Sequence, residues 1–316
     1  MEILFLGTGA GIPSKFRNVS SLALKLLDEL NEVWLFDCGE ATQHQILQTT
    51  IRPRKVRRIF ITHMHGDHIF GLPGFLSSRS FQMSEIEPLS IYGPKGIAGF
   101  IQNSLKFSKT KLQYPLEIVE LEDQGGIIDL DKGWRVKYLP LNHGTLCFGY
   151  RIQEPDHPGE LLMDRVKEYN VSHGPLLGQL KAGKEITLDN GTKLHGKDFI
   201  GPAKPGRIVT ILGDTRSHEN VYHLAKDSDV LIHEATHDGS EAKMAHHYFH
   251  STNEQAAQIA KKAQVKRLLM NHISARYMYT DILDIQNKSQ DIFKEAYIVK
   301  DFDEFDIPLR SVERSK

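Results

Sequence analysis

The residues most able to do chemistry lie in one short stretch of the first quarter of the chain. His63, His65, Asp67 and His68 form the pattern H-x-H-x-D-H, directly after the largely apolar stretch 58–62. Imidazole nitrogen and carboxylate oxygen are the ligands that zinc favours in hydrolytic sites. Side chains this closely spaced, at the turn between a strand and a helix, can face one cavity. We therefore expect the loop to serve two metal ions.

Three further candidate ligands lie far apart in the sequence but share one placement. His143, Asp214 and His272 each follow a short apolar stretch that predicts a strand. Those stretches are residues 136–139, 208–212 and 267–270. Taken alone, His143 or His272 would more often be an ordinary histidine. Because strand ends meet at one edge of a sheet, however, all seven side chains are expected at one rim.

This ligand pattern resembles that of the metallo-β-lactamase superfamily. The resemblance implies an αββα sandwich with a two-metal site of two zinc ions per subunit. Carried over residue by residue, one zinc would be held by His63, His65 and His143, the other by Asp67, His68 and His272, with Asp214 bridging the two. The lactamases themselves usually carry Cys where Asp214 stands, so this set is similar to the phosphoesterase branches.

Four further motifs resemble the short form of ribonuclease Z, a family within that superfamily. They are the P-x-K-x-R-N run 13–18, the stretch 36–45, the run His233-Glu234-Ala235-Thr236 and the run His250-Ser251-Thr252. The resemblance spans almost the whole chain and implies a zinc-dependent endoribonuclease that trims the 3′ ends of precursor tRNA. It also implies that Lys15 and Arg17 contact phosphate or the terminal bases. By themselves, two cations in a Gly-rich turn are merely compatible with phosphate binding.

A mechanism follows for hydrolysis of an RNA phosphodiester. Two zinc ions would acidify a shared water and hold a phosphate oxygen for in-line attack. Asp67 would orient or deprotonate that water, and His250, oriented by Glu234, would give a proton to the leaving 3′ oxygen. The family resemblance implies cleavage after the discriminator base, which leaves a 3′-hydroxyl on the tRNA and a 5′-phosphate on the trailer.

The elements that must position these residues alternate between strands and helices. Short runs rich in β-branched and aromatic residues predict strands at residues 3–6, 22–27, 33–36, 56–61, 89–92, 136–139 and 148–152. Apolar residues at helical spacing predict helices at residues 41–50, 66–81, 96–107, 220–225, 253–263 and 281–295. We therefore expect an α/β fold in which two sheets pack face to face beneath outer helices.

The stretch 154–206 departs from this pattern, with eight Gly and five Pro in 53 residues. Its flanking strands would otherwise be consecutive, so we expect a single metallo-β-lactamase domain over residues 1–316 with an inserted, flexible, protruding arm. The alternative is a flexible linker that joins two domains. The family resemblance, which includes His173-Gly174-Pro175, implies that the arm is a tRNA-binding exosite.

The charge of the stretch 154–206 limits how it could hold RNA. It carries seven Lys and Arg against eight Asp and Glu. A broad basic patch is therefore absent from its sequence, and binding would depend on a few positioned cations. The candidates are Lys181, Lys184 and Lys204.

Composition narrows the class of protein further. The net charge is −1, so nucleic-acid binding needs a local patch. The basic run 52–58 is either a solvated face or a border of the active-site cleft or dimer groove. Cys38 and Cys147, each beside apolar residues, favour a reducing compartment. With no secretory leader and no run of eighteen apolar residues, we expect a cytoplasmic protein without a membrane partner. The resemblance further implies a homodimer in which the arm of one subunit binds the tRNA that the other subunit cleaves.

Two other functions remain open at the level of the sequence. One is a small-molecule phosphodiesterase or a thioester hydrolase resembling glyoxalase II, which the long arm and the P-x-K-x-R-N loop disfavour. The other is a non-catalytic RNA-binding scaffold, whose usual mark is the loss of metal ligands. All seven candidate ligands are present in this chain, which favours the nuclease.

Overall fold

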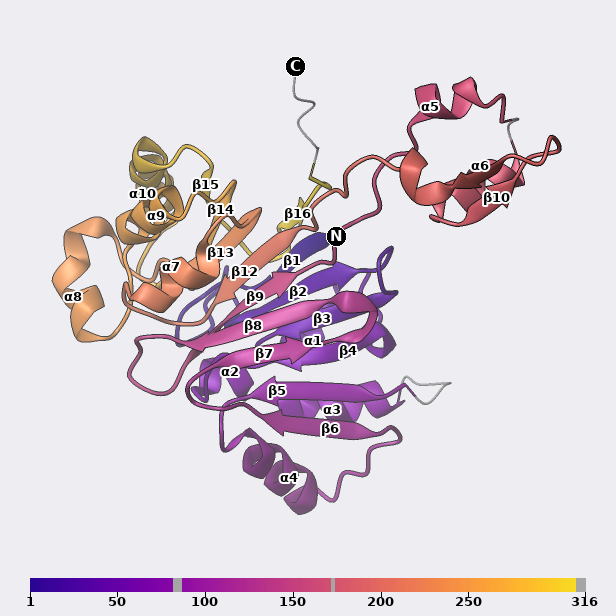
Figure 1. Cartoon of the computed structure of the whole chain (residues 1–316). Coiled ribbons are helices and arrows are strands. Elements are labelled where there is room, and N and C mark those ends of the chain that lie inside the picture. Colours follow the sequence, from indigo (N-terminus) through magenta and orange to yellow (C-terminus); the bar gives the residue numbers. More distant parts are fainter. Residues whose placement is uncertain (82–86, 172–173, 311–316) are drawn as a thin grey trace. The chain divides into compact units, whose positions relative to one another are not determined.

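The computed structural model describes residues 1–81, 87–171 and 174–310. The chain divides into two compact units. The first is formed by Met1–Gln153 and Ile208–Pro308, and the second by Glu154–Arg207 with the C-terminal residues from Leu309 onward. The first unit contains both large sheets (Figure 1). Every candidate metal ligand also belongs to it. Residues 154–206, which the composition distinguishes, all belong to the second unit.

Two seven-stranded sheets form the first unit. The first sheet runs, edge to edge, β16 (Glu304–Asp306), β1 (Glu2–Gly7), β2 (Ser21–Leu26), β3 (Glu32–Phe36), β4 (Val56–Phe60), β5 (Leu89–Gly93) and β6 (Leu116–Glu120). The second sheet runs β15 (Ala296–Ile298), β14 (Leu268–Asn271), β13 (Val230–Glu234), β12 (Ile208–Leu212), β9 (Phe148–Gln153), β8 (Arg135–Pro140) and β7 (Gly126–Asp129). Strands β3 to β6 are parallel, and so are β12 to β15. The loops after each parallel set therefore gather at one end of its sheet.

Side-chain alternation along the strands divides the apolar residues between two layers. In β1, Ile3 belongs to a buried cluster that draws residues from both sheets, whereas its neighbour Leu4 belongs to a cluster on the opposite face. Trp34 of the first sheet meets Trp134, just before β8 of the second, with ring centroids 5.6 Å apart in an edge-on arrangement. The predicted face-to-face packing of the sheets is confirmed.

Helices cover the outer faces of the sheets (Figure 1). The first half of the chain supplies α1 (Thr42–Ile46), α2 (Gly66–Ile69), α3 (Leu72–Phe81) and α4 (Ile97–Phe107), and the second half supplies α7 (Glu219–Ala225), α8 (Ala242–His247), α9 (Asn253–Lys262) and α10 (Tyr279–Ile292). Short 3-10 helices are η1 (Pro53–Lys55), η2 (Asp131–Gly133) and η4 (Gly239–Glu241). The layers confirm the predicted αββα sandwich of the α/β class. Among the helices of the described residues, none has the length and apolar character needed to cross a membrane.

Two predicted helices are wrong in extent. The helix expected at 66–81 is two helices, α2 and α3, and the one expected at 41–50 is only the five residues of α1. The break between α2 and α3 falls where the Gly71 backbone packs on Gly39, because a Cβ on residue 71 would lie 2.0 Å from the Gly39 carbonyl oxygen. Apolar spacing continues across this break, so the sequence pattern does not reveal it. Strands β6, β7, β13, β15 and β16 were also not predicted.

The second unit has a small core of its own. It consists of α5 (Met163–Glu168), α6 (Pro175–Lys181), a hairpin of β10 (Glu185–Thr187) and β11 (Lys193–His195), and η3 (Gly196–Phe199). Their buried side chains are Val166, Leu180, Ile186, Leu194 and Phe199. Where the chain enters and leaves the unit, the buried Glu154 carboxylate accepts hydrogen bonds from Arg207 Nε and Nη2, each at 2.7 Å. His173, part of one family-like motif, lies outside the described residues.

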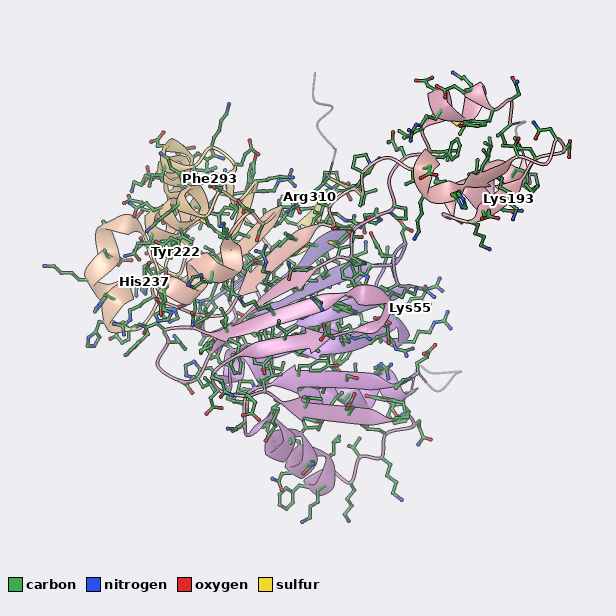
Figure 2. All side chains as sticks on the ribbon, in the orientation of Figure 1. Lys55, Lys193, Tyr222, His237, Phe293 and Arg310 are labelled. Carbon is green, nitrogen blue, oxygen red and sulfur yellow. The ribbon has the colours of Figure 1, made fainter. Side chains whose placement is uncertain are left out.

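The basic run 52–58 lies at the start of β4, whereas the metal loop follows the end of that strand. Arg58 forms an ion pair with Glu32, which neutralises one cation of the run inside the fold. Figure 2 shows Lys55 and His237 at opposite ends of the sheets. The run does not border the ligand rim, so the alternative that it borders the active-site cleft is wrong, and its place at a dimer groove stays a prediction.

Candidate metal centre

The seven candidate ligands leave four strand ends and meet in one place. They are His63, His65, Asp67 and His68 after β4, His143 after β8, Asp214 after β12 and His272 after β14. Their ligand atoms form groups of three that lie within 4.8 Å of one another. One group is His63, His65 and His143, and another is Asp67, His68 and His272. The structure thus brings together the same two triads that the family resemblance implies.

The distances within each triad are short. His65 Nδ1 lies 3.0 Å from His63 Nε2 and 3.3 Å from His143 Nε2. In the other triad, Asp67 Oδ2 lies 3.4 Å from Nε2 of both His68 and His272.

Asp214 stands between the two triads. Its Oδ2 atom lies 3.7 Å from His63 Nε2, 3.6 Å from His68 Nε2 and 3.2 Å from His272 Nε2. Its side chain is buried. One carboxylate therefore reaches both groups of ligands, as a bridging ligand must.

This donor set fits zinc. Ligand atoms about 2.0–2.1 Å from a tetrahedral zinc ion are about 3.3 Å from one another, the spacing seen within both triads. The Nε2 atom of His68 is buried and, within the described chain, has no hydrogen-bond partner. Such an atom is costly unless a ligand satisfies it. A cation placed between the triads would satisfy it and balance the two carboxylates.

Neighbouring groups orient the ligands through their remaining polar atoms. His68 Nδ1 lies 2.7 Å from Asp37 Oδ2, and His272 Nδ1 lies 2.8 Å from the Thr236 hydroxyl. His143 Nδ1 lies 3.0 Å from the carbonyl oxygen of Phe249. Such second contacts fix the ring orientation of metal-binding histidines. Sequence reasoning missed these three partners, although Asp37 and Thr236 fall inside family-like motifs.

Two ligands of the cluster have pKa values shifted toward the forms that bind metals. Burial and the charge of His68 hold the pKa of His63 well below its usual range. Burial would raise the pKa of Asp214, but the charges of His272 and His68 outweigh it and lower that pKa well below its usual range. A neutral imidazole and an ionised carboxylate are the forms that ligate metals.

Beside the ligands lies a pair of residues with a different role. His250 Nδ1 is 2.9 Å from Glu234 Oε1, and the same carboxylate oxygen accepts a hydrogen bond from the Thr215 N–H (2.8 Å). Burial disfavours the charged imidazole, but the carboxylates of Glu234 and Asp214 raise the pKa of His250 to about 9. The arrangement can hold a proton at neutral pH within 4.0 Å of the bridging Asp214. The structure therefore brings the predicted pair together at the edge of the ligand cluster.

The predicted RNA-contacting cations fall into two kinds. Lys15 is exposed, and so are Lys181 and Lys184 of the second unit. Arg17 instead donates from Nη1 to the Thr8 hydroxyl (2.7 Å) and the Val299 carbonyl (2.5 Å), so it fixes its own loop.

Lys204 differs from the other two cations of the second unit. Its Nζ lies 2.5 Å from Glu160 Oε1, within the same unit. That ion pair leaves Lys181 and Lys184 as the stronger candidates for RNA contact.

Comparisons with known proteins bear on the family and the fold. The family model described as anti-Pycsar protein Apyc1 matches residues 1–142, less than half of the chain. The ribonuclease Z of Lactobacillus acidophilus is 58% identical over 310 residues, which cover 98% of this chain and 99% of that protein. The crystal structure of human tRNase Z, short form, is similar with a TM-score of 0.70 and 28% identity, covering 98% of this chain and all of that one. The metallo-β-lactamase fold protein YhfI from Bacillus subtilis has a TM-score of 0.65 at 16% identity over 96% of this chain and 98% of its own, which concerns the fold alone.

Proposed function

The chain belongs to the ribonuclease Z family of endoribonucleases, and on that premise we propose that it removes 3′ trailers from precursor tRNA with two zinc ions per subunit. The observation that carries the proposal is the pair of ligand triads joined by Asp214, with the His250–Glu234 pair at their edge. A two-metal centre suits phosphodiester hydrolysis, and a neighbouring protonated imidazole suits a leaving alkoxide.

The zinc ions, when bound, would make water nucleophilic at neutral pH and draw charge from the phosphate oxygens. Asp67 receives the N–H of Gly11 at 2.9 Å, which holds its carboxylate in one orientation. Burial would raise the pKa of Asp67, but a hydrogen bond from His272 and the charge of His68 lower it well below its usual range. A carboxylate held in this way suits Asp67 as a metal ligand that also orients or deprotonates the attacking water.

We assign His250 to the protonation of the leaving 3′ oxygen. A 3′ alkoxide is a poor leaving group unless a proton arrives as the bond to phosphorus breaks. Glu234 accepts from Thr215 and lies against His250 Nδ1, so it orients the ring and stabilises its charge. Despite burial, the carboxylate of Glu234 raises the pKa of His250, which favours the protonated ring that a general acid needs. Cleavage of this kind leaves a 3′-hydroxyl on the tRNA and a 5′-phosphate on the trailer.

Substrate binding completes the proposal. Exposed Lys15 would contact the acceptor end, while Arg17 would hold the shape of the loop. Residues 154–206 would act as an exosite through Lys181 and Lys184, with the enzyme a cytoplasmic homodimer whose subunits share one tRNA. Neither the small-molecule hydrolase nor the inactive scaffold accounts for family membership together with a complete ligand set.

The test is incubation of purified protein with a 3′-extended precursor tRNA and with bis-p-nitrophenyl phosphate, with and without chelator. We expect one cut in the RNA, lost on chelation and restored by Zn²⁺. Hydrolysis of the small ester without cleavage of the RNA would contradict the proposal and favour a small-molecule hydrolase. Binding of RNA without cleavage of either substrate would favour the scaffold.

A further inference from the structure

A cavity of about 220 Å³ opens beside the His250–Glu234 pair. It is lined by Asn142, Arg216, Ser217, His246, His250 and Gln255. All six residues belong to the first unit, and one of them, His250, is the proposed general acid.

Arg216 is a cation whose guanidinium is only partly satisfied by the protein. Nη1 donates to Nε2 (3.1 Å) and the carbonyl oxygen (3.3 Å) of His246, and Nη2 donates to Asn142 Oδ1 (3.1 Å). Its face stacks on the Phe249 ring, 4.0 Å from the centroid. The buried Nε–H has no hydrogen-bond partner in the described chain. A guanidinium carries five N–H donors and the protein accepts from three of them, so one N–H of Nη2 remains for a ligand besides the buried Nε–H.

Several other arginines of the fold pair with carboxylates. Arg207 forms two hydrogen bonds to Glu154, and Arg276 pairs with Glu241 at 2.8 Å. No ion pair joins Arg216 to a carboxylate of the described residues, although the side chain is half-buried. A charge withdrawn from water without a counter-charge is costly, so this position favours binding of an anion.

The other lining residues favour the same class of ligand. The Asn142 amide oxygen is occupied by Arg216, and the Gln255 amide oxygen accepts the Thr252 N–H at 3.0 Å. Their amide N–H groups are therefore the atoms left for a ligand. The Ser217 hydroxyl adds a further donor, and the lining includes no carboxylate. A cavity with donors, a guanidinium and no acid is suited to phosphate.

We propose that this cavity binds the RNA phosphate on the 5′ side of the nucleotide whose 3′ oxygen leaves. This inference rests on the proposed function and on His250 as its general acid. In an in-line displacement the leaving oxygen lies opposite the attacking water, so the nucleotide nearest His250 is the one retained by the tRNA. The next phosphate along that strand is its own 5′-phosphate, and Arg216 is the cation that receives it.

The test combines a protein change with a change in that one phosphate. Arg216→Ala and Arg216→Lys are assayed on a precursor tRNA and on the same RNA with a neutral methylphosphonate at the proposed phosphate. A charge-assisted contact of this kind predicts a loss in kcat/KM of roughly 10- to 100-fold for Arg216→Ala on the normal RNA. We expect a similar loss for the wild type on the neutral linkage, and little further loss when both changes are combined. Arg216→Lys keeps the positive charge but not the planar guanidinium that binds phosphate through two N–H groups, so its loss in kcat/KM should be intermediate.

A binding measurement provides a readout without catalysis. The tRNA product, which ends in the 3′-hydroxyl of the same nucleotide, retains the proposed phosphate. Arg216→Ala should lower the slope of log Kd against log salt for this product by about one phosphate contact. Arg135→Ala, which removes an exposed arginine paired with Asp129 at 2.8 Å, is the matched control and should leave the slope unchanged.

Two results would overturn the inference. Equal losses for Arg216→Ala on the charged and the neutral RNA would mean that Arg216 acts only by holding the turn at His246 and Phe249. An unchanged salt slope would mean that the cavity receives no phosphate. If instead the wild type fails to cut the precursor, the proposed function fails, and product binding alone decides whether the phosphate subsite exists.

Discussion

The ligand rim and the segment 154–207 differ in how their function is encoded. At the rim, seven side chains from four strand ends meet with ligand atoms 3.0 to 3.7 Å apart. The segment builds a separate core from Val166 and four other apolar residues, and presents scattered lysines. A metal centre demands fixed residue types at fixed distances, whereas an RNA-binding surface can be made from a few cations almost anywhere. The metal centre therefore fixes the residue type at many positions of the sequence, whereas the RNA-binding surface fixes it at only a few.

The largest effect is expected at the rim. His65→Ala or Asp214→Ala removes a ligand that no neighbour replaces, so zinc content should fall and cleavage of precursor tRNA should be nearly abolished. Folding should survive, because His65 and Asp214 lie on loops outside the sheets. Metal analysis and a cleavage assay check this, with His223→Ala, an exposed histidine of α7, as control. Wild-type turnover with full zinc content in either ligand variant would show that the assignment is wrong at that position.

A smaller loss is expected beside the rim. His250→Ala should slow cleavage of precursor tRNA by roughly 10²- to 10⁴-fold, because the 3′ oxygen then leaves without a proton. The loss should be much smaller on bis-p-nitrophenyl phosphate, whose leaving group needs little protonation, and zinc content should not change. Equal losses on the two substrates would indicate a structural role for His250.

Replacing residues 156–205 with a short Gly/Ser linker tests the RNA-binding role of the segment 154–207. None of the ligands or their orienting partners lies in this segment. We expect kcat/KM for precursor tRNA to fall about 10²-fold through poorer positioning of the phosphate, with small-ester hydrolysis retained. The salt dependence should change little, because the segment 154–206 has seven cations against eight acids. Unchanged tRNA cleavage would make the segment a linker, and loss of the small-ester activity would make it part of the catalytic centre.

The smallest effect on catalysis is expected from Glu154→Gln. Both Glu154 and Arg207 are buried, so losing the carboxylate charge should destabilise the second unit by about 3 kcal/mol. Hydrogen exchange should quicken in β10 and β11 and stay slow in β12 and β13, with zinc content unchanged. Faster exchange throughout both units would contradict the view that this segment folds around its own core.

The same carboxylate gives the second unit a pH dependence. Burial would raise the pKa of Glu154, but hydrogen bonds and charge from Arg207 lower it below the ordinary 4.5. A depressed folded-state pKa contributes stability that is present above pH 4.5 and is lost as the pH falls through the folded value. The wild type should lose protection in β10 and β11 over this acidic range, and Glu154→Gln should show no such step.

Much of the fold and the ligand cluster could be predicted, because both depend on local patterns. Strand periodicity placed the elements after which His143, Asp214 and His272 stand, and parallel strands open toward the same end. What could not be predicted depends on contacts between distant residues. The helix break at Gly71 depends on its contact with Gly39. The orientation of Arg17 depends on its hydrogen bond to the Val299 carbonyl.

The most direct test of the central claim is the number of zinc ions per chain. Chelator-treated protein is titrated with Zn²⁺, and bound metal is measured by mass spectrometry alongside cleavage of precursor tRNA. We predict saturation at two zinc ions per chain, with full cleavage reached only at saturation, because two triads share Asp214. Full activity at one zinc per chain, or in protein that retains no metal after chelation, would contradict the account.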